Sequence, residues 1–177
     1  MRLLLTGTPG CGKTTLAKKI AKKLKAKLVD VTALVESHGI YSVNSRKEKV
    51  VDLRKLQKIL KPIVAKEKNV VVESHLLCEI PLECDRIVVL RCEPLALKKR
   101  LEKRGYPAWK VKENVMAEML DYCSIKASEN YEEGKIVEID FTMPLSPGKV
   151  LAKRKGDRVN WMPEFAKIRE KLKGFLD

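Results

Sequence analysis

Eight residues near the N-terminus form the clearest candidate for chemistry in the chain. The stretch GTPGCGKT, from Gly7 to Thr14, follows an apolar run and precedes a lysine-rich helical pattern. It fits the pattern G-x-x-x-x-G-K-[ST], in which glycines let successive backbone N–H groups turn toward phosphate oxygens. A helix that begins there adds the partial positive charge of its N-terminus. The stretch therefore predicts a loop that binds the phosphates of a nucleotide.

Each polar residue of this loop has an expected role. Lys13 is expected to reach the β- and γ-phosphates, the Thr14 hydroxyl to ligate Mg²⁺, and Thr15 to contact the α-phosphate. A tight strand-to-helix turn with a surface lysine would explain one glycine, but not the joint presence of the other residues. The predicted nucleotide-binding residues of the loop are Gly7, Gly10, Cys11, Gly12, Lys13, Thr14 and Thr15.

A second apolar run ends in an acid and a histidine. The stretch NVVVESH, from Asn69 to His75, has the form of a strand whose terminal carboxylate holds Mg²⁺ through water. Glu73 is the candidate metal ligand. His75 lies two residues further on, so its side chain can face the same side and lie near the γ-phosphate or an attacking water. A purely structural histidine is the alternative.

Two arginines follow on one predicted helix. Arg100 and Arg104 are four residues apart within LKKRLEKRGYPAW, so both lie on one helical face. Two guanidinium groups on one face suit a triphosphate, since phosphoryl transfer depends on neutralising charge. A solvated basic face is the alternative, and it is the interpretation given to the neighbouring lysines. The predicted catalytic residues are Lys13, Glu73, His75 and Arg104.

The elements that must position these residues alternate between strand and helix, which is typical of an α/β fold with a parallel sheet. Pro62 predicts a kink or break near Lys61, and Met143–Lys149 is expected to form a loop. The predicted strands are Arg2–Thr6, Lys27–Val31, Asn69–Glu73, Asp85–Arg91 and Lys135–Asp140. The predicted helices are Lys13–Lys25, Asp52–Lys66, Pro94–Arg104, Lys110–Tyr131 and Pro163–Phe175.

Composition limits the classes of protein that fit. The 177 residues suffice for one domain, and no apolar run approaches the roughly 20 residues of a membrane span. The apolar stretch at the N-terminus is too short for a secretory signal, so a cytoplasmic location is expected. Five cysteines without a CxxC pair argue against a disulfide framework and a zinc site and favour reduced structural thiols. The net charge of +14 favours polyanions such as nucleotides, RNA or ribosomal surfaces, although a lysine-coated protein from a hot environment is equally compatible.

Taken together, the phosphate loop, the strand-terminal acid and the R-x-x-x-R-G pattern resemble a nucleoside monophosphate (NMP) kinase. The stretches GTPGCGKT, VVVESH and LEKRGYPAWKVKENVMAEM are most similar to the small adenylate kinase and ATPase family of ribosome biogenesis, shared by archaea and eukaryotes. The resemblance spans about residues 1–140. It implies a three-layer P-loop NTPase fold whose five parallel strands have the order 2-3-1-4-5, with helices on both faces. Residues 1–177 then form one domain, with an NMP-binding region near 32–52 and a small lid near 104–112.

The same resemblance implies a broad-specificity kinase that transfers the γ-phosphate of ATP to AMP, giving two ADP, with Mg²⁺ and with ATPase activity alongside. It also implies a role in small ribosomal subunit biogenesis and rRNA maturation, with a platform ribosomal protein and pre-rRNA as partners. The protein is expected to act as a monomer. The family's D-x-H positions match Glu73 and His75, and its lid-base arginine, which contacts ATP, matches Arg104.

Three departures from the family pattern concern the acceptor side. Glu73 stands in place of the aspartate, Glu36 falls near the place of an acceptor-binding arginine, and SVNSRKEK replaces an acidic patch. Arg46 or Arg54 can substitute for the missing arginine. The alternative function is an assembly-factor ATPase with little NMP kinase activity that remodels a ribosomal protein or pre-rRNA. A plain nucleic-acid-binding module is disfavoured because 5% aromatic residues leave few stacking platforms.

Overall fold

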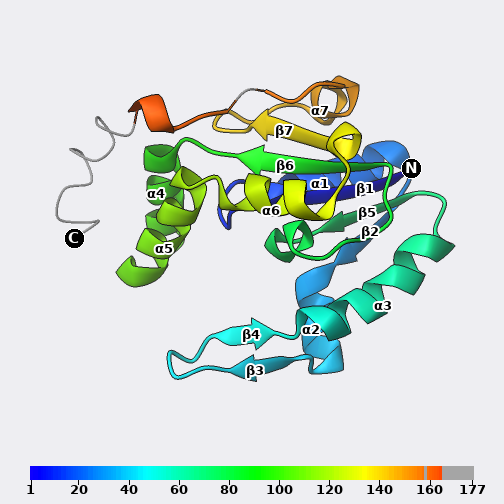
Figure 1. Cartoon of the computed structure of the whole chain (residues 1–177), viewed down its shortest axis with the longest axis horizontal. Helices are drawn as coiled ribbons and strands as arrows, with labels where there is room; N and C mark the ends of the chain where they lie inside the picture. Colours follow the sequence, from blue (N-terminus) through cyan, green and yellow to red (C-terminus); the bar gives the residue numbers. More distant parts are fainter. Residues whose placement is uncertain (158, 165–177) are drawn as a thin grey trace.

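The computed structural model describes residues 1–157 and 159–164, arranged around one central sheet (Figure 1). Five parallel strands lie in the order β2-β5-β1-β6-β7. Counted along the chain within this sheet, the order is 2-3-1-4-5, and helices cover both faces, so the predicted three-layer fold is confirmed. The strands are β1 (Arg2–Gly7), β2 (Lys27–Asp30), β5 (Val70–Glu73), β6 (Arg86–Arg91) and β7 (Ile136–Asp140).

The two faces of the sheet bury alternate residues of each strand. Leu3 and Leu5 pack on one side with α1, α4, α5 and α7, whereas Leu4 packs on the other side with α2 and α3. Helix α6 covers the part of the second side that lies over β6. The helices are α1 (Lys13–Leu24), α2 (Val31–His38), α3 (Leu53–Lys66), α4 (Pro94–Lys103), α5 (Ala108–Met119), α6 (Tyr122–Asn130) and α7 (Pro147–Ala152). Single 3-10 turns span His75–Cys78, Glu133–Lys135 and Met162–Glu164.

An antiparallel hairpin between α2 and α3 was not expected from the sequence. Its strands are β3 (Tyr41–Val43) and β4 (Lys49–Val51), and it projects away from the sheet on the side where α5 lies (Figure 1). Helix α2 precedes the hairpin. Asp30 caps the start of α2, because its carboxylate accepts hydrogen bonds from amides of the first helical turn. The helix ends at Gly39, whose φ of 60° turns the chain into β3.

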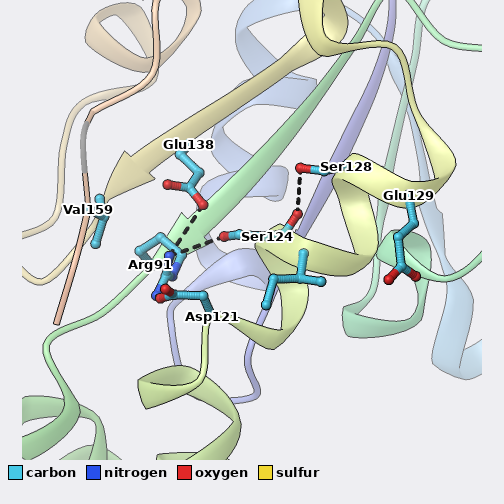
Figure 2. Close-up of a pocket in the computed structure, with 8 residues that line it drawn as sticks. Arg91, Asp121, Ser124, Ser128, Glu129, Glu138 and Val159 are labelled. Atoms are coloured by element: carbon cyan, nitrogen blue, oxygen red, sulfur yellow. Dashed lines mark hydrogen bonds and ion pairs between the residues drawn. The ribbon is translucent and has the colours of Figure 1, made fainter. Parts of the chain in front are cut away.

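A buried ion-pair cluster joins the end of β6 to α5, α6 and β7 (Figure 2). Arg91 is 1% exposed and donates from Nε to Oε1 of Glu118 at 2.8 Å. Its other nitrogens reach Asp121, Ser124 at 3.1 Å and Glu138 at 3.3 Å. Although burial opposes the charged form, the Glu118 carboxylate raises the pKa of Arg91 above its ordinary value. The cluster fixes α5 and α6 to the sheet.

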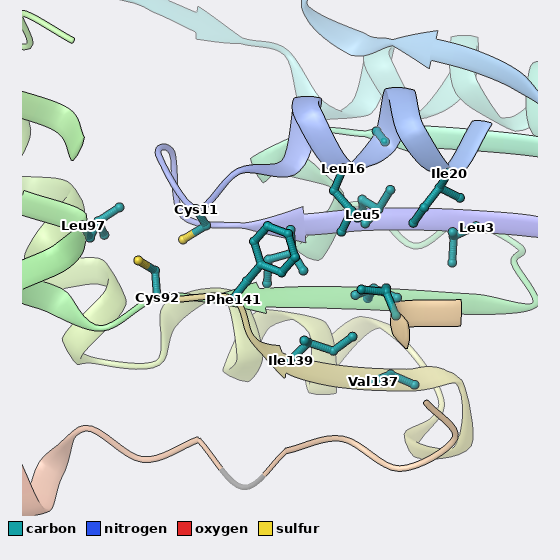
Figure 3. Packing of buried hydrophobic residues seen from close by; sticks show 14 of the residues in the cluster. Leu3, Leu5, Cys11, Leu16, Ile20, Cys92, Leu97, Val137, Ile139 and Phe141 are labelled. Atoms are coloured by element: carbon teal, nitrogen blue, oxygen red, sulfur yellow. The ribbon is translucent and has the colours of Figure 1, made fainter. Parts of the chain in front are cut away.

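The larger hydrophobic core lies between the sheet and α1 (Figure 3). Leu16 and Ile20 of α1 lie over Leu3 and Leu5 of β1, and each of these four side chains is at most 1% exposed. Burial of such a side chain contributes about 1.5–3 kcal/mol. Phe141, which follows β7, extends this core to the loop before α1. The start of α1 is therefore anchored to the sheet by packing.

The prediction of one continuous helix over Lys110–Tyr131 is wrong. The structure has α5 and α6 there, separated at Leu120 and Asp121. Asp121 adopts the left-handed region with φ 53°, which ends one helix and begins the next. Aspartate tolerates this conformation better than most residues, and its carboxylate is held by Arg91.

Other predicted boundaries differ as well. Helix α3 continues through Pro62, so a break at Lys61 does not occur; the carbonyl group that loses its donor belongs to the exposed residue Lys58, where water can reach it. Residues 147–149, expected in a loop, begin α7, which Ser146 caps. The helix predicted over Pro163–Phe175 falls on residues outside those described, apart from the short turn that ends at residue 164. Within the described residues no helix combines the length and apolarity that crossing a membrane requires.

Candidate active site

The loop between β1 and α1 depends on glycine because its backbone touches the sheet. Gly7 has φ 130°, and a Cβ there would lie 2.2 Å from the carbonyl oxygen of Leu90 in β6. Gly10 has φ 96°, and a Cβ there would come within 2.8 Å of Leu97 in α4. Both values lie in the left-handed region that side chains disfavour. The loop therefore curls tightly over the carboxyl end of the sheet, as the sequence pattern predicts.

Helix α1 begins directly at this loop with its first amides open to a ligand. Gly12 occupies the cap position, and among the described residues no side chain caps the helix. Uncapped N-terminal amides carry partial positive charge and suit an anion. The Cys11 side chain is buried, and its sulfur points toward Cys92 (Figure 3), so Cys11 offers a ligand only its backbone. Thr15, in the first turn of α1, is exposed.

Lys13 places its ammonium group inside the loop. Its Nζ donates to the carbonyl oxygens of Gly7 at 2.7 Å and Thr8 at 3.1 Å, and the residue is 8% exposed. Burial lowers the pKa of Lys13, because the charged form loses hydration there. A polyphosphate beside this ammonium would restore the favourable electrostatic environment. The position fits the role that the sequence predicts for Lys13.

The two predicted metal ligands lie in direct contact. Thr14 Oγ1 donates to Glu73 Oε1 at 3.1 Å, because Glu73 ends β5 beside Leu5 of β1. Hydroxyl and carboxylate oxygens are ligands that Mg²⁺ accepts, and this ion commonly takes its remaining ligands from water and substrate phosphates. Among the described residues no cluster of three or more His, Cys, Asp or Glu could hold a metal alone. The pair therefore fits Mg²⁺ that arrives with a nucleotide.

His75 begins the turn after β5 and lines a cleft that Lys13, Thr14 and Glu73 also line. Desolvation by the surrounding protein, followed by the charges of Lys13 and Lys110, lowers the pKa of His75 to about 4. The imidazole is therefore neutral near pH 7, with one ring nitrogen able to accept a proton or a hydrogen bond. Its carbonyl group accepts a bond from Thr6 Oγ1 at 3.2 Å, which fixes the turn to β1. His75 is an exposed residue that lines the cleft, as contact with a water or substrate requires.

All four predicted catalytic residues line one cleft of about 940 Å³. Its walls come from the phosphate loop, the turn after β5, the hairpin loop and α5. Cationic side chains outnumber carboxylates along this wall, so the cleft favours a polyanion. The cations are Lys13, Arg46, Lys47, Lys49, Arg104 and Lys110, and the carboxylates are Glu48, Glu73 and Glu113.

A smaller hollow of about 200 Å³ lies on the other side of the phosphate loop. Phe141, Pro144 and Leu145 give it an apolar wall, and Thr15 lies at its edge. Arg104 lines both this hollow and the larger cleft. The two hollows therefore meet at the loop, with one guanidinium group shared between them.

Arg100 and Arg104 both line the smaller hollow, but only Arg104 also lines the larger cleft. Arg100 lines only the smaller hollow, where its guanidinium group donates to Cys92 Sγ at 3.2 Å and to the carbonyl oxygen of Thr142. Arg104 follows α4 and is exposed. The larger cleft therefore receives only one of the two arginines, and a role for Arg100 in binding ATP stays a prediction.

Several residues of the site were missed at the sequence level. Trp109, Lys110 and Glu113 of α5 line the cleft, and Glu118 contacts the loop from behind through Thr8 Oγ1 at 2.5 Å. A signal for Glu118 was available, because it shares the apolar face of α5 with the buried residues Val111 and Val115. A charge at such a position needs a buried partner. Of the residues that the hairpin brings to the cleft, Arg46 was named at the sequence level as one of two arginines that can bind the acceptor, whereas Lys47, Glu48 and Lys49 were not.

Comparison with known proteins identifies related sequences. A family model described as "AAA domain" matches residues 3–121. A protein of Methanocaldococcus jannaschii named "Putative adenylate kinase" is 41% identical over 144 residues, which are 80% of this chain and 77% of that protein. A protein of the same name from Thermococcus onnurineus is 32% identical over 178 residues, covering 95% of each chain.

Solved structures share the fold at low sequence identity. A shikimate kinase from Bacteroides thetaiotaomicron has a TM-score of 0.57 and 19% identity, and the match covers 97% of this chain and 98% of that one. A gluconokinase from Sinorhizobium meliloti has a TM-score of 0.55 and 16% identity, covering 96% and 94%. These structures support the α/β fold of the chain.

Proposed function

The chain belongs to the AAA domain family and to the P-loop kinase family of these archaeal relatives, and on that premise we propose that it is a nucleoside monophosphate kinase. It transfers the γ-phosphate of ATP to AMP, or to another nucleoside monophosphate, to give two nucleoside diphosphates. The name of the relatives supports an adenine nucleotide as acceptor. We expect the reaction to take place in the cytoplasm.

The observation that carries this proposal is the meeting of two hollows at one phosphate loop. The smaller hollow has the apolar wall and the adjacent arginine that suit a nucleobase, while the larger cleft has the cations that suit phosphates. A nucleoside triphosphate with its base in the smaller hollow would direct its terminal phosphate into the larger cleft. The larger cleft, at about 940 Å³, has room for a second nucleotide as well as that phosphate.

Positioning and charge neutralisation then carry the chemistry. The amides at the start of α1 and the Lys13 ammonium bind the donor phosphates, and Arg104 neutralises charge between the hollows. Thr14 and Glu73 would hold Mg²⁺, which supplies further neutralisation of the phosphate oxygens. Neutral His75 can orient the acceptor by donating its ring N–H to an oxygen of the acceptor phosphate. An oxygen of the acceptor phosphate, which is unprotonated near pH 7, attacks the γ-phosphorus as the bond to the ADP oxygen breaks, so the step requires no proton transfer.

The same residues support a second function, an ATPase that assists ribosome assembly. His75 is accessible to water and adjoins Glu73, so it can orient a water as readily as an acceptor nucleotide. The charge of +14 favours a partner such as pre-rRNA or a protein bound to it. In this alternative, small-subunit maturation uses ATP hydrolysis at this site to remodel a platform ribosomal protein. The two functions are compatible in one chain.

The experiment that tests the proposal measures ADP and free phosphate together, with ATP alone and then with each nucleoside monophosphate. A kinase forms ADP in excess over phosphate when its acceptor is added. Equal amounts of ADP and phosphate under every condition would remove the kinase proposal and leave the ATPase.

Lys13→Ala tests whether both activities use this loop. We expect ATP turnover to fall about a hundredfold or more, because the substitution removes the charge that faces the transferred phosphate. Lys18→Ala is the matched control, since Lys18 is exposed on the same helix and lies outside both hollows. An equal loss of ATP turnover in the two variants would mean that turnover does not depend on the phosphate loop.

A further inference from the structure

The hairpin loop and α5 meet across the mouth of the larger cleft through two crossed ion pairs. Arg46 of the hairpin loop donates from Nη1 to Glu113 Oε1 at 2.8 Å, and Lys110 of α5 contacts Glu48 Oε1 at 2.9 Å. The Trp109 ring contacts both cations, with its centroid 5.3 Å from Cζ of Arg46 and 5.7 Å from Nζ of Lys110. Each element therefore offers the other one cation and one carboxylate.

The hairpin loop is built to present these groups. Asn44 Oδ1 accepts bonds from the backbone amides of Arg46 at 3.0 Å and Glu48 at 2.9 Å. Between them Lys47 takes the left-handed conformation, φ 61°, and its amide donates to the Asn44 carbonyl oxygen. This turn holds the backbone while the side chains of Arg46 and Glu48 extend toward α5. The turn therefore fixes the backbone of Arg46, while its long side chain can change partners.

The pairs are strong enough to hold the side chains and weak enough to exchange. The side chains of Arg46 and Glu113 are 61% and 55% exposed. Ion pairs at such exposure contribute little because water and salt screen them. A phosphate monoester carries up to two negative charges and accepts two parallel bonds from a guanidinium group, so it competes well with one carboxylate. All four members of the crossed pairs line the cleft in which that phosphate would lie.

Three other cations of the cleft have other contacts or positions. Lys13 is held within the phosphate loop, and Arg104 lies between the two hollows. Lys49 contacts Glu36 at 2.5 Å and lies over the Tyr41 ring at 4.8 Å. Glu36 therefore draws Lys49 toward α2, away from the phosphate loop. Arg46 is the planar cation that faces the cleft from the side opposite the donor.

We infer that Arg46 binds the phosphate of the acceptor nucleotide, and that Glu113 holds Arg46 only until this phosphate replaces it. The inference rests on the proposed kinase function and names the residue that recognises its second substrate. When the phosphate replaces Glu113, Lys110 of α5 still lines the cleft, so the hairpin and α5 each keep a cation that can contact the same ligand.

Replacement of Glu113 by the phosphate makes a prediction that differs from that of a purely structural ion pair. If Glu113 competes with the phosphate for Arg46, removing the charge of Glu113 strengthens binding, while removing the charge of Arg46 weakens it. If the pair only supports the shape of the cleft, both substitutions break the same contact and change binding in the same direction. The sign of the effect at Glu113 therefore separates the two explanations.

The experiment is calorimetric titration of the full chain with AMP, and with adenosine as the probe that lacks a phosphate. We expect Arg46→Gln to weaken AMP binding about tenfold to a hundredfold, and Glu113→Gln to tighten it about two- to fivefold. Arg54→Gln is the matched control, since Arg54 is exposed at the start of α3 outside the cleft, and it should bind AMP as the wild type does. Adenosine binding should be the same in all four proteins.

The outcomes separate failure of this inference from failure of the proposed function. Weaker AMP binding in both Arg46→Gln and Glu113→Gln would overturn the exchange, as would unchanged AMP binding in Arg46→Gln while the wild type still phosphorylates AMP. A wild type that neither binds AMP nor phosphorylates any nucleoside monophosphate would overturn the proposed function itself. Circular dichroism of each variant confirms that the fold is retained, which is expected because both positions are exposed.

Discussion

Helix α5 forms an arginine–carboxylate pair on each of two sides, and the two pairs lie in opposite environments. Glu118 pairs with Arg91 at 2.8 Å, and both side chains are 1% exposed. Glu113 pairs with Arg46 at the same distance, and both side chains are more than half exposed. The chemistry of the two contacts is the same, so burial decides what each can do. One pair fixes the helix to the sheet, and the other can exchange its partner.

The buried pair is fixed because every group around it is satisfied. Glu118 accepts bonds from Thr8 Oγ1, from the amide of Cys92 at 3.1 Å and from Trp161 Nε1 at 3.2 Å, in addition to Arg91. Among the described residues no buried side-chain nitrogen or oxygen lacks a partner. This arrangement holds the phosphate loop from behind, while the exposed pair faces the cleft from in front.

Arg91→Met should have the largest effect on stability. The substitution leaves the Glu118 carboxylate buried without its countercharge, which should lower the free energy of unfolding by about 3–5 kcal/mol. Arg46→Met should lower it by less than about 1 kcal/mol, because the exposed Glu113 is hydrated when the arginine is lost. Urea denaturation of the two variants measures the difference. Similar losses would mean that burial does not distinguish the two pairs.

Thr8→Val should have an intermediate effect that also reaches the active site. The valine matches the shape of threonine but cannot donate to Glu118, so the free energy of unfolding should fall by about 1–3 kcal/mol. Because the Thr8 carbonyl group helps to hold Lys13, ATP turnover should fall as well. Stability from denaturation and turnover from ADP formation are measured on the same sample. A loss of stability without any change in turnover would separate the buried cluster from the phosphate loop.

Lowering the pH should weaken the exposed contact between Lys110 and Glu48, and this is the smallest of the predicted effects. The hydrogen bond from Lys110, followed by that from Asn44, holds the pKa of Glu48 below its ordinary value of 4.5. The unfolded chain therefore binds this proton first, so the contribution of Glu48 to stability is present above pH 4.5 and is lost as the pH falls through its folded value. Carboxyl titration by NMR should place the Glu48 pKa below 4.5 in the wild type and return it toward 4.5 in Lys110→Met. A Glu48 that titrates alike in both proteins would contradict the contact.

The sequence was sufficient for the parts of this molecule where pattern and structure are local. The glycine loop followed its motif, and apolar runs such as Val70–Glu73 became the expected strands. The contact between Thr14 and Glu73 could be anticipated because adjacent parallel strands bring their carboxyl ends together. The order of the five strands came from the family resemblance and is confirmed.

The rest depended on tertiary contacts that no short pattern contains. The strands Tyr41–Val43 and Lys49–Val51 are three residues long and largely exposed, so they lack the apolar alternation that marks a strand. The break at Asp121 depends on a left-handed aspartate held by Arg91, whose partner was unknown from the sequence. Arg46 was one of two arginines proposed for the acceptor side, and only the fold places it rather than Arg54 at the cleft.

The fate of the γ-phosphate tests the central claim most directly. Wild-type protein is given ATP labelled in its γ-phosphate, with and without AMP, and the label in ADP and in free phosphate is followed at early times. A nucleoside monophosphate kinase places the label in ADP when AMP is present, and Arg46→Gln should reduce this transfer at low AMP. Label that appears only in free phosphate, at a rate that AMP does not change, would contradict the account.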